Sequence, residues 1–320
     1  MDPLMKSPIS PDARIFVAGH CGMVGSAIVN RLKRAGYPKL LCRSRQDLDL
    51  TDARAVKQFF NQESPDVVFL AAARVGGIEA NRTYPVEFLY ENLLIGANVI
   101  HAAAEAGVTK LIFLGSSCIY PRLLDQPIRE DHLLTGPLEP TNEAYAIAKI
   151  ASLKLCEYYQ RQYQKRFISV MPTNLYGPGD RFDPHRAHVI PALLRRFHQA
   201  KQQQAPSVTV WGSGTPRREF LFVDDLADAL LLLLQVYEDP QPINVGIGVD
   251  LTIDDLSQVI RSVVGFTGEI VFDTTKPDGV PQKRLDVSRV SALGWQAKTS
   301  LIDGLTMTYR WAQAEHLLES

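Results

Sequence analysis

Tyr145 and Lys149 are the residues whose types and spacing most directly indicate chemistry. They lie four positions apart in a stretch with a helical pattern, so the phenol and the ammonium share one helix face. A free tyrosine has a pKa of about 10, and a neighbouring ammonium lowers that pKa by stabilising the phenolate. Such a phenol can supply the proton that a ketone needs when hydride reaches its carbon. The alternative is a solvated surface pair, which occurs by chance in many helices.

Three glycines predict a site for a dinucleotide. Gly19, Gly22 and Gly25 follow a predicted strand, Arg14–Ala18, and open a predicted helix, Val24–Ala35. Glycines allow the tight turn and the close approach of backbone to a pyrophosphate, and the helix N-terminus adds amide donors and a favourable dipole. The spacing is G-x-x-G-x-x-G, and glycines at a strand–helix junction can also serve packing alone.

The end of the second predicted strand favours NADP over NAD. An NAD site usually has an acidic residue about 20 residues beyond the glycines, where it binds the ribose 2′-hydroxyl. Here the strand Leu40–Cys42 runs into Arg43 and Arg45, and guanidiniums suit a 2′-phosphate. An ordinary solvated arginine pair is the alternative. Asp49 is then a candidate contact for the adenine.

The elements that must position these residues alternate between strands and helices. Short apolar runs that alternate with helical patterns indicate a parallel sheet covered on both faces. We therefore predict an α/β fold, a Rossmann-type doubly wound parallel sheet with a smaller C-terminal substrate-binding α/β domain. The further predicted strands are Asp66–Ala71, Lys110–Leu114 and Phe167–Met171, and the further helices are Ala53–Asn61, Val86–Ala106 and Ala146–Gln164.

The second half of the sequence is less regular. Residues 172–191 are rich in Pro, Gly, Asp and His and are predicted to form a loop. Later elements are the helix Leu226–Val236, the strand Ile243–Val245, the helices Ile253–Val264 and Leu301–Ala314, and a turn at residues 276–279. We predict an NADP-binding domain from residues 14–176 and 217–245, a substrate-binding domain from residues 177–216 and 246–320, and a flexible tail from residues 1–13.

Composition limits the classes of partner. The 320 residues carry a formal net charge of −1, with 46% hydrophobic and 22% charged residues, which gives no basic surface for nucleic acid or for a membrane. The four cysteines contain no C-x-x-C pair, so neither a metal site nor a disulfide framework is expected. Residues 1–13 have no apolar core and are not expected to be a signal peptide, and the most apolar stretch, residues 227–236, is too short to span a bilayer. We expect a cytoplasmic protein with a small-molecule substrate.

Several longer motifs carry a resemblance to a known family. Together with the glycines and the Tyr145/Lys149 pair, they resemble the extended short-chain dehydrogenase/reductase family, and most closely its GDP-L-fucose synthases, which act on GDP-4-keto-6-deoxy-mannose with NADPH. The resemblance runs from Arg14 to Trp311. The motifs are GSSCIYP at 115–121, PTNEAYAIAK at 140–149, PTNLYGPG at 172–179, HVIPALLRRF at 188–197 and VWGSGTPRREF at 210–220.

The resemblance assigns acid/base roles. Ser116 matches a catalytic hydroxyl that binds the reacting carbonyl, while Cys118 and His188 match a thiol and its partner histidine. Epimerising a carbon beside a ketone needs one group to remove a proton and another to return one on the opposite face. A thiol and an imidazole, with reference pKa values of about 8.5 and 6.5, suit that exchange. From residue type alone, Ser116 is equally a loop cap, Cys118 a small buried hydrophobe and His188 a helix-start residue.

The resemblance also implies the binding residues. The substrate contacts are Arg196, Trp211, Arg218 and Asp278, where cations suit a diphosphate and an aromatic or acidic group suits the guanine or the sugar. The cofactor contacts are Gly19, Gly22, Met23, Val24, Gly25, Arg43, Arg45, Asp49, Leu114, Gly115, Ser116, Ser117, Tyr145, Lys149, Pro172, Thr173, Asn174, Leu175 and His188.

Alternatives stay open at this stage. Cys21 stands where the family often has an arginine, which leaves the strictness of the NADPH preference open. The related sugar-nucleotide 4,6-dehydratases and C4 epimerases are rival readings, as is a non-catalytic Rossmann protein. A dehydratase is expected to have Asp-Glu at positions 117 and 118, and a non-catalytic protein commonly lacks Tyr145 or Lys149. The family also implies a homodimer formed through the helices at 86–106 and 146–164.

Overall fold

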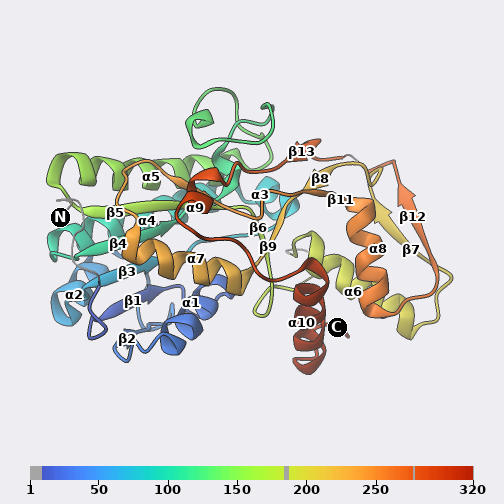
Figure 1. The fold of residues 1–320 in the computed structure, drawn as a ribbon, viewed down its shortest axis with the longest axis horizontal. Helices are drawn as coiled ribbons and strands as arrows, with labels where there is room; N and C mark the ends of the chain where they lie inside the picture. Colours follow the sequence, from blue (N-terminus) through green and yellow to red (C-terminus); the bar gives the residue numbers. More distant parts are fainter. Residues whose placement is uncertain (1–8, 184–186, 277, 320) are drawn as a thin grey trace.

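A six-stranded parallel sheet forms the centre of the larger part of the molecule (Figure 1). The computed structural model describes residues 9–183, 187–276 and 278–319. The strand order is β10-β5-β4-β3-β1-β2, and every pairing is parallel. The strands are β1 (Ile15–Ala18), β2 (Leu40–Leu41), β3 (Val67–Leu70), β4 (Lys110–Leu114), β5 (Arg166–Pro172) and β10 (Ile243–Val245).

The strand order reverses direction at β1. The chain passes from β1 to β2 on one side and then returns to pair β3 on the other side. In open α/β sheets, ligands bind beyond the carboxyl ends of the strands at such a switch point. The glycine-rich turn at residues 19–25 lies directly after β1, at that end of the sheet. The topology thus places the predicted dinucleotide loop where the fold class expects a ligand.

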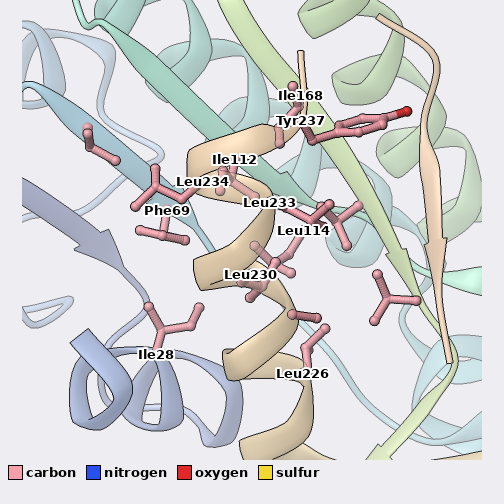
Figure 2. Packing of buried hydrophobic residues seen from close by; sticks show 14 of the residues in the cluster. Ile28, Phe69, Ile112, Leu114, Ile168, Leu226, Leu230, Leu233, Leu234 and Tyr237 are labelled. Atoms are coloured by element: carbon pink, nitrogen blue, oxygen red, sulfur yellow. The ribbon is translucent and has the colours of Figure 1, made fainter. Parts of the chain in front are cut away.

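Helices cover both faces of this sheet because alternate strand residues point to opposite sides. Ile15 and Val17 belong to a core with α1 (Met23–Arg34) and α7 (Val223–Val236). Figure 2 shows leucines of α7 packed over residues from β3 and β4 in this layer. Phe16 and Ala18 belong to the opposite core, which also contains residues of α2 (Ala53–Glu63), α4 (Pro85–Glu105) and α5 (Glu143–Tyr163).

A separate core forms the smaller part of the molecule. It packs α6 (Val189–Gln202), α8 (Ile253–Val264) and α10 (Leu301–Ala314) with the paired strands β7 (Ser207–Trp211) and β12 (Glu269–Asp273). Thr252 and Asp255 form a capping box at the start of α8, and Gly265, with φ 73°, ends the helix. The remaining short elements are β8 (Arg217–Arg218), β11 (Leu251–Thr252) and β13 (Gln282–Lys283), which form a three-stranded sheet, together with α3 (Ile78–Thr83) and α9 (Ser288–Ala292).

The structure confirms the predicted fold class and corrects the prediction of a loop over residues 172–191. The stretch 172–191 contains β6 (Asn174–Tyr176), which pairs with β9 (Phe220–Phe222), and α6 already begins at Val189. A three-residue strand is too short to be recognised among turn-forming residues. Ile9 and Ala13 of the predicted tail are buried in the core that contains α7, whereas residues 1–8 of the tail lie outside the described residues. In the described part of the chain, no helix has both the length and the apolarity to cross a membrane.

Candidate active site

The glycine turn is built to bring backbone close to a ligand. Gly19 has φ 90°, and a Cβ at Gly25 would lie 2.1 Å from the Gly19 carbonyl oxygen, so side chains are excluded at both positions. The Gly22 amide donates to that same oxygen at 3.0 Å. Helix α1 begins at Met23 with no side-chain cap and no acidic residue in its first turn. Its N-terminal amides are therefore suited to a pyrophosphate.

The two arginines after β2 have different environments. Arg43 is paired with Glu63 at 2.6 Å, and its guanidinium lies 5.6 Å from the centre of the Phe59 ring. The Arg45 side chain is 71% exposed, and its nearest carboxylates are those of Glu91 at 3.5 Å and Asp49 at 3.8 Å. Arg45 is thus the cation with more freedom to reach a 2′-phosphate, whereas Arg43 is already held by a protein carboxylate.

Lys149 and Tyr145 lie on the first turns of α5, at the carboxyl end of β4. The Lys149 Nζ donates to the Leu114 carbonyl at 2.8 Å and lies 5.7 Å from the centre of the Tyr145 ring. Burial lowers the pKa of Lys149 to about 7. Burial also raises the pKa of the Tyr145 phenol, with a further increase from the nearby Cys118 and an opposing hydrogen bond with Ser116.

This electrostatic balance corrects one expectation from the sequence. Lys149 was expected to lower the pKa of the Tyr145 phenol, but in the protein alone burial dominates and the phenol stays protonated. The reason is that both groups are removed from water, and the ammonium is engaged with the Leu114 carbonyl. A protonated phenol is the form that can donate a proton to a developing alkoxide.

The two candidate serines in the loop after β4 have different surroundings. Ser116 caps a short 3-10 turn at Ser117–Ile119, and its Oγ accepts from the Cys118 amide at 3.2 Å. Ser116 also hydrogen-bonds with Tyr145, whereas Ser117 is buried, with 3% of its surface exposed. The structure therefore brings Ser116 to the phenol. Cys118 is partly exposed and lies close enough to Tyr145 and Arg218 to influence the charge of both.

The other predicted cofactor contacts gather around the same edge of the sheet. Met23 and Val24 open α1. Leu114 ends β4 and Gly115 follows it, where an added Cβ would collide with the Met171 side chain at 2.2 Å. The segment 172–175 joins the end of β5 to the start of β6. Its Thr173 and Asn174 side chains donate to the Glu219 carbonyl at 3.2 and 2.8 Å. This segment is therefore fixed by the chain beyond the sheet.

His188 occupies the N-cap position of α6, on a different element from Cys118. Part of the residue is exposed, yet the imidazole lies among enough protein that burial lowers its pKa, and the charge of Arg181 lowers it further. A neutral imidazole near physiological pH is able to accept a proton.

The predicted substrate residues come from the smaller part of the molecule. Trp211 is 64% exposed, with Arg196 5.7 Å and Lys276 5.5 Å from its ring centre. Arg196 and Trp211 both line a groove of about 390 Å³ beside α6. Asp278 accepts from the Ser213 hydroxyl at 2.7 Å and influences the charge of Arg218. Cations and an exposed aromatic face thus occur together, as recognition of a nucleoside diphosphate requires.

The sequence analysis missed Asp180, a buried carboxyl in the loop before α6. Its Oδ2 atom has no hydrogen-bond partner among the described residues, and burial raises its pKa to about 7. The neighbouring Gly179 packs against the N-terminus of α1, since a Cβ there would lie 3.1 Å from the Met23 Cα. The GPGD sequence signalled a turn, but nothing local indicated a buried carboxyl. The described residues contain no cluster of His, Cys, Asp and Glu that could hold a metal ion.

Comparisons with known proteins agree with this arrangement. Residues 15–246 match the NAD dependent epimerase/dehydratase family. A protein of Escherichia coli (strain K12) described as GDP-L-fucose synthase is 58% identical over 307 residues, covering 93% of this chain and 96% of that protein. GDP-L-fucose synthase 1 of Arabidopsis thaliana is 56% identical, covering 96% of this chain and 95% of that protein.

Solved structures with similar folds include nucleotide-sugar enzymes. A GDP-L-fucose synthetase from Naegleria fowleri bound to NADP has a TM-score of 0.90 at 32% identity, covering 98% of this chain and 96% of the other. A GDP-6-OMe-4-keto-L-xylo-heptose reductase from C. jejuni has a TM-score of 0.91 at 35% identity, covering 97% of this chain and 100% of the other.

Proposed function

The chain belongs to the NAD dependent epimerase/dehydratase family, and on that premise we propose that it converts GDP-4-keto-6-deoxy-D-mannose to GDP-L-fucose with NADPH. The reaction combines epimerisation at C3 and C5 with reduction of the C4 ketone. The observation that carries the proposal is the meeting of Ser116, Tyr145 and Lys149 at the end of β4, with Cys118, two residues after Ser116, close to Tyr145 and to Arg218.

NADPH fits the residues at the carboxyl edge of the sheet. The uncapped N-terminus of α1 and the closely packed glycines suit its pyrophosphate, and Arg45 suits its 2′-phosphate. The similarity to the NADP-bound synthetase supports this choice. When bound, the cofactor supplies the hydride for the ketone. Cys21 is exposed beside the glycine turn and adds no positive charge there, so Arg45 is the main determinant of the preference.

Reduction depends on the groups around Tyr145. Ser116 holds the C4 carbonyl oxygen by a hydrogen bond, and the protonated Tyr145 phenol gives that oxygen a proton as it becomes an alkoxide. The phenolate left behind faces Lys149, whose buried ammonium stabilises it. A Lys149 pKa of about 7 allows the lysine to exchange protons near neutral pH.

Epimerisation uses the ketone before it is reduced. The carbonyl makes the hydrogens on C3 and C5 acidic, so a base can remove one and leave an enolate. We assign Cys118 and His188 to removal and return of these protons, one on each face of the sugar. Arg218 lies close enough to Cys118 for the two groups to interact electrostatically, which places a cation beside this thiol. The lowered pKa of His188 keeps a neutral imidazole available.

A cytoplasmic homodimer is part of the same proposal. Large apolar side chains are exposed on α4 and α5, which pack against each other: Val86 is 72% exposed, Tyr90 62% and Tyr158 52%. A second copy that covers them would form a four-helix interface. All four cysteines are free thiols, as suits a reducing compartment. Light scattering at micromolar concentration tests the dimer, and a strict monomer would contradict it.

The decisive test is turnover of GDP-4-keto-6-deoxy-mannose with NADPH, followed by NMR of the product. We expect NADPH consumption and formation of GDP-L-fucose. A dehydratase would instead act on a sugar nucleotide without consuming added NADPH, and a C4 epimerase would return an epimer with tightly held NAD. A non-catalytic protein would bind the dinucleotide without turnover. Each of these three results would refute the proposal.

A further inference from the structure

Glu219 is a fully buried carboxylate, and it is the single residue between β8 and β9. Its Oε1 accepts from the backbone amides of Ile247 at 2.6 Å and Gly248 at 2.8 Å. Its Oε2 accepts from the amide of Leu285 at 2.8 Å. A buried charge needs such partners, because an unpaired carboxylate is costly away from water.

These partners belong to segments that are distant in sequence. Ile247 and Gly248 follow β10, the edge strand of the six-stranded sheet, whereas Leu285 follows β13 in the small three-stranded sheet. The backbone carbonyl of Glu219 also accepts from the side chains of Thr173, which lies between β5 and β6, and Asn174, which begins β6. The hydrogen bonds of Glu219 therefore link the dinucleotide side of the molecule to its substrate side.

The Glu219 carboxylate is also packed tightly against neighbouring backbone. A Cβ on Gly246 would lie 2.1 Å from Oε1 of Glu219, closer than any real contact, so the carboxylate packs directly against that backbone. A substitution at Gly246 can therefore disturb the hydrogen bonds of the Glu219 carboxylate without altering Glu219 itself.

Arg218 ends β8 and directly precedes Glu219 in the chain. Because the two residues are consecutive, anchoring the Glu219 side chain in the interior restrains the backbone from which the Arg218 side chain extends. Arg218 is paired in register with Leu251 on one side and Lys283 on the other. Its guanidinium is influenced by both Asp278 and Cys118.

We propose that Glu219 is a positioning residue, which holds Arg218 between the substrate diphosphate and Cys118 by joining the amides of Ile247, Gly248 and Leu285. The inference rests on the proposed function, because it requires Arg218 to contact a GDP-sugar. Glu219 itself touches neither the substrate nor the cofactor. A change of the carboxylate is expected to act on the substrate side, because its partners Ile247, Gly248 and Leu285 are not predicted cofactor contacts. The cofactor segment is bound by the backbone carbonyl of Glu219, which a side-chain substitution keeps.

Glu219→Gln tests this role with little change of shape. The amide oxygen can still accept from Ile247 and Gly248, but the NH₂ group then faces the Leu285 amide, and neither can accept. We expect the KM for GDP-4-keto-6-deoxy-mannose and the Kd for GDP to rise by about tenfold, the scale of one lost charge-assisted hydrogen bond. The Kd for NADPH should stay within about twofold. Gly246→Ala should give the same pattern.

Glu238→Gln is the matched control, since Glu238 is a carboxylate that binds Lys110 and Arg166 at the opposite end of the sheet. It should lower thermal stability without raising the KM. An unchanged KM in Glu219→Gln, or an equal loss of NADPH affinity, would overturn the positioning role. If Glu219→Gln does not fold, Gly246→Ala replaces it in the test. An unchanged KM or an equal loss of NADPH affinity in that variant would overturn the positioning role. Failure of the proposed function would be distinct, because the unmodified enzyme would then not consume the keto-sugar.

Discussion

The two ends of β4 each hold a buried lysine, and the two lysines have opposite surroundings. At the amino end, Lys110 donates to Glu238 at 3.0 Å and to the carbonyls of Leu233 and Tyr237 at 3.1 and 2.7 Å. At the carboxyl end, the Lys149 ammonium donates to the Leu114 carbonyl at 2.8 Å, and burial lowers its pKa to about 7. A buried cation with a protein carboxylate is structural, and one without a carboxylate is available to a ligand.

The arginines after β2 repeat this contrast near the surface. Arg43 has a close carboxylate partner in Glu63, at 2.6 Å, whereas Arg45 has only contacts of 3.5 Å or more. Sequence motifs do not distinguish the two, because each is an arginine at the end of a strand. The same rule therefore predicts that Arg45 contributes more to cofactor binding than Arg43, which is already paired.

The largest expected effect comes from removing the phenol that Lys149 faces. Tyr145→Phe should lower the rate of ketone reduction by about 10²–10⁴, the usual contribution of a general acid. The Kd for NADPH should be unchanged, because the glycine turn is untouched. Tyr309→Phe is the control, since that hydroxyl bonds to His198 in the smaller core at 2.8 Å. Stopped-flow measurement of NADPH oxidation gives the reduction rate of both variants. An undiminished rate in Tyr145→Phe would show that Tyr145 is not the general acid.

The two lysines should also differ in how they affect stability. The pKa of Lys149 is about 7 when folded, below its unfolded value of about 10.4. The folded state therefore binds fewer protons between these values, and stability rises as the pH increases from 7 to 10. Lys149→Met removes this pH dependence. The corresponding change in the free energy of unfolding between these two pH values is on the order of 4 kcal/mol.

Urea denaturation of the protein without cofactor checks this prediction. Lys149→Met should be more stable than the unmodified protein at pH 7, and the difference should shrink toward pH 10. A difference that is constant with pH would mean that the lysine does not titrate in this range.

Lys110→Met should have the opposite sign. It leaves Glu238 with Arg166 alone and removes the donor for two buried carbonyls, so the free energy of unfolding should fall by about 3 kcal/mol. The turnover of the protein that remains folded should be normal, because the side chain lies at the far end of β4. Urea denaturation measures the free energy of unfolding, and the rate per folded molecule measures the turnover. A loss of turnover with intact stability would contradict the structural role.

Arg45→Ala is expected to have the smallest effect of the four. Loss of one charge-assisted contact should weaken NADPH binding by about tenfold and leave NADH binding nearly unchanged, since only NADPH has the 2′-phosphate. Arg43→Ala should lower stability and affect the two cofactors equally. Fluorescence titration with both cofactors distinguishes these patterns. A selective loss of NADPH affinity in Arg43→Ala would reverse the assignment of the two arginines.

The sequence by itself determined the features that depend on local spacing. Tyr145 and Lys149 share a face because a helix has about 3.6 residues per turn, and the glycines at 19, 22 and 25 mark a close backbone turn after a strand. The alternation of apolar runs and helical patterns was enough to predict a doubly wound parallel sheet, which the structure confirms.

Only the tertiary structure decided which charges have partners and which are buried. The carboxylate that holds Lys110 is 128 residues away in the chain, and the amide that meets Oε2 of Glu219 is 66 residues away. Burial raises the pKa of Tyr145, and an oxygen of the buried Asp180 has no partner within the described part of the chain; neither effect has a local sequence pattern. Desolvation and ion pairing depend on the neighbours that packing supplies, so these properties follow from the fold and not from the spacing of residues.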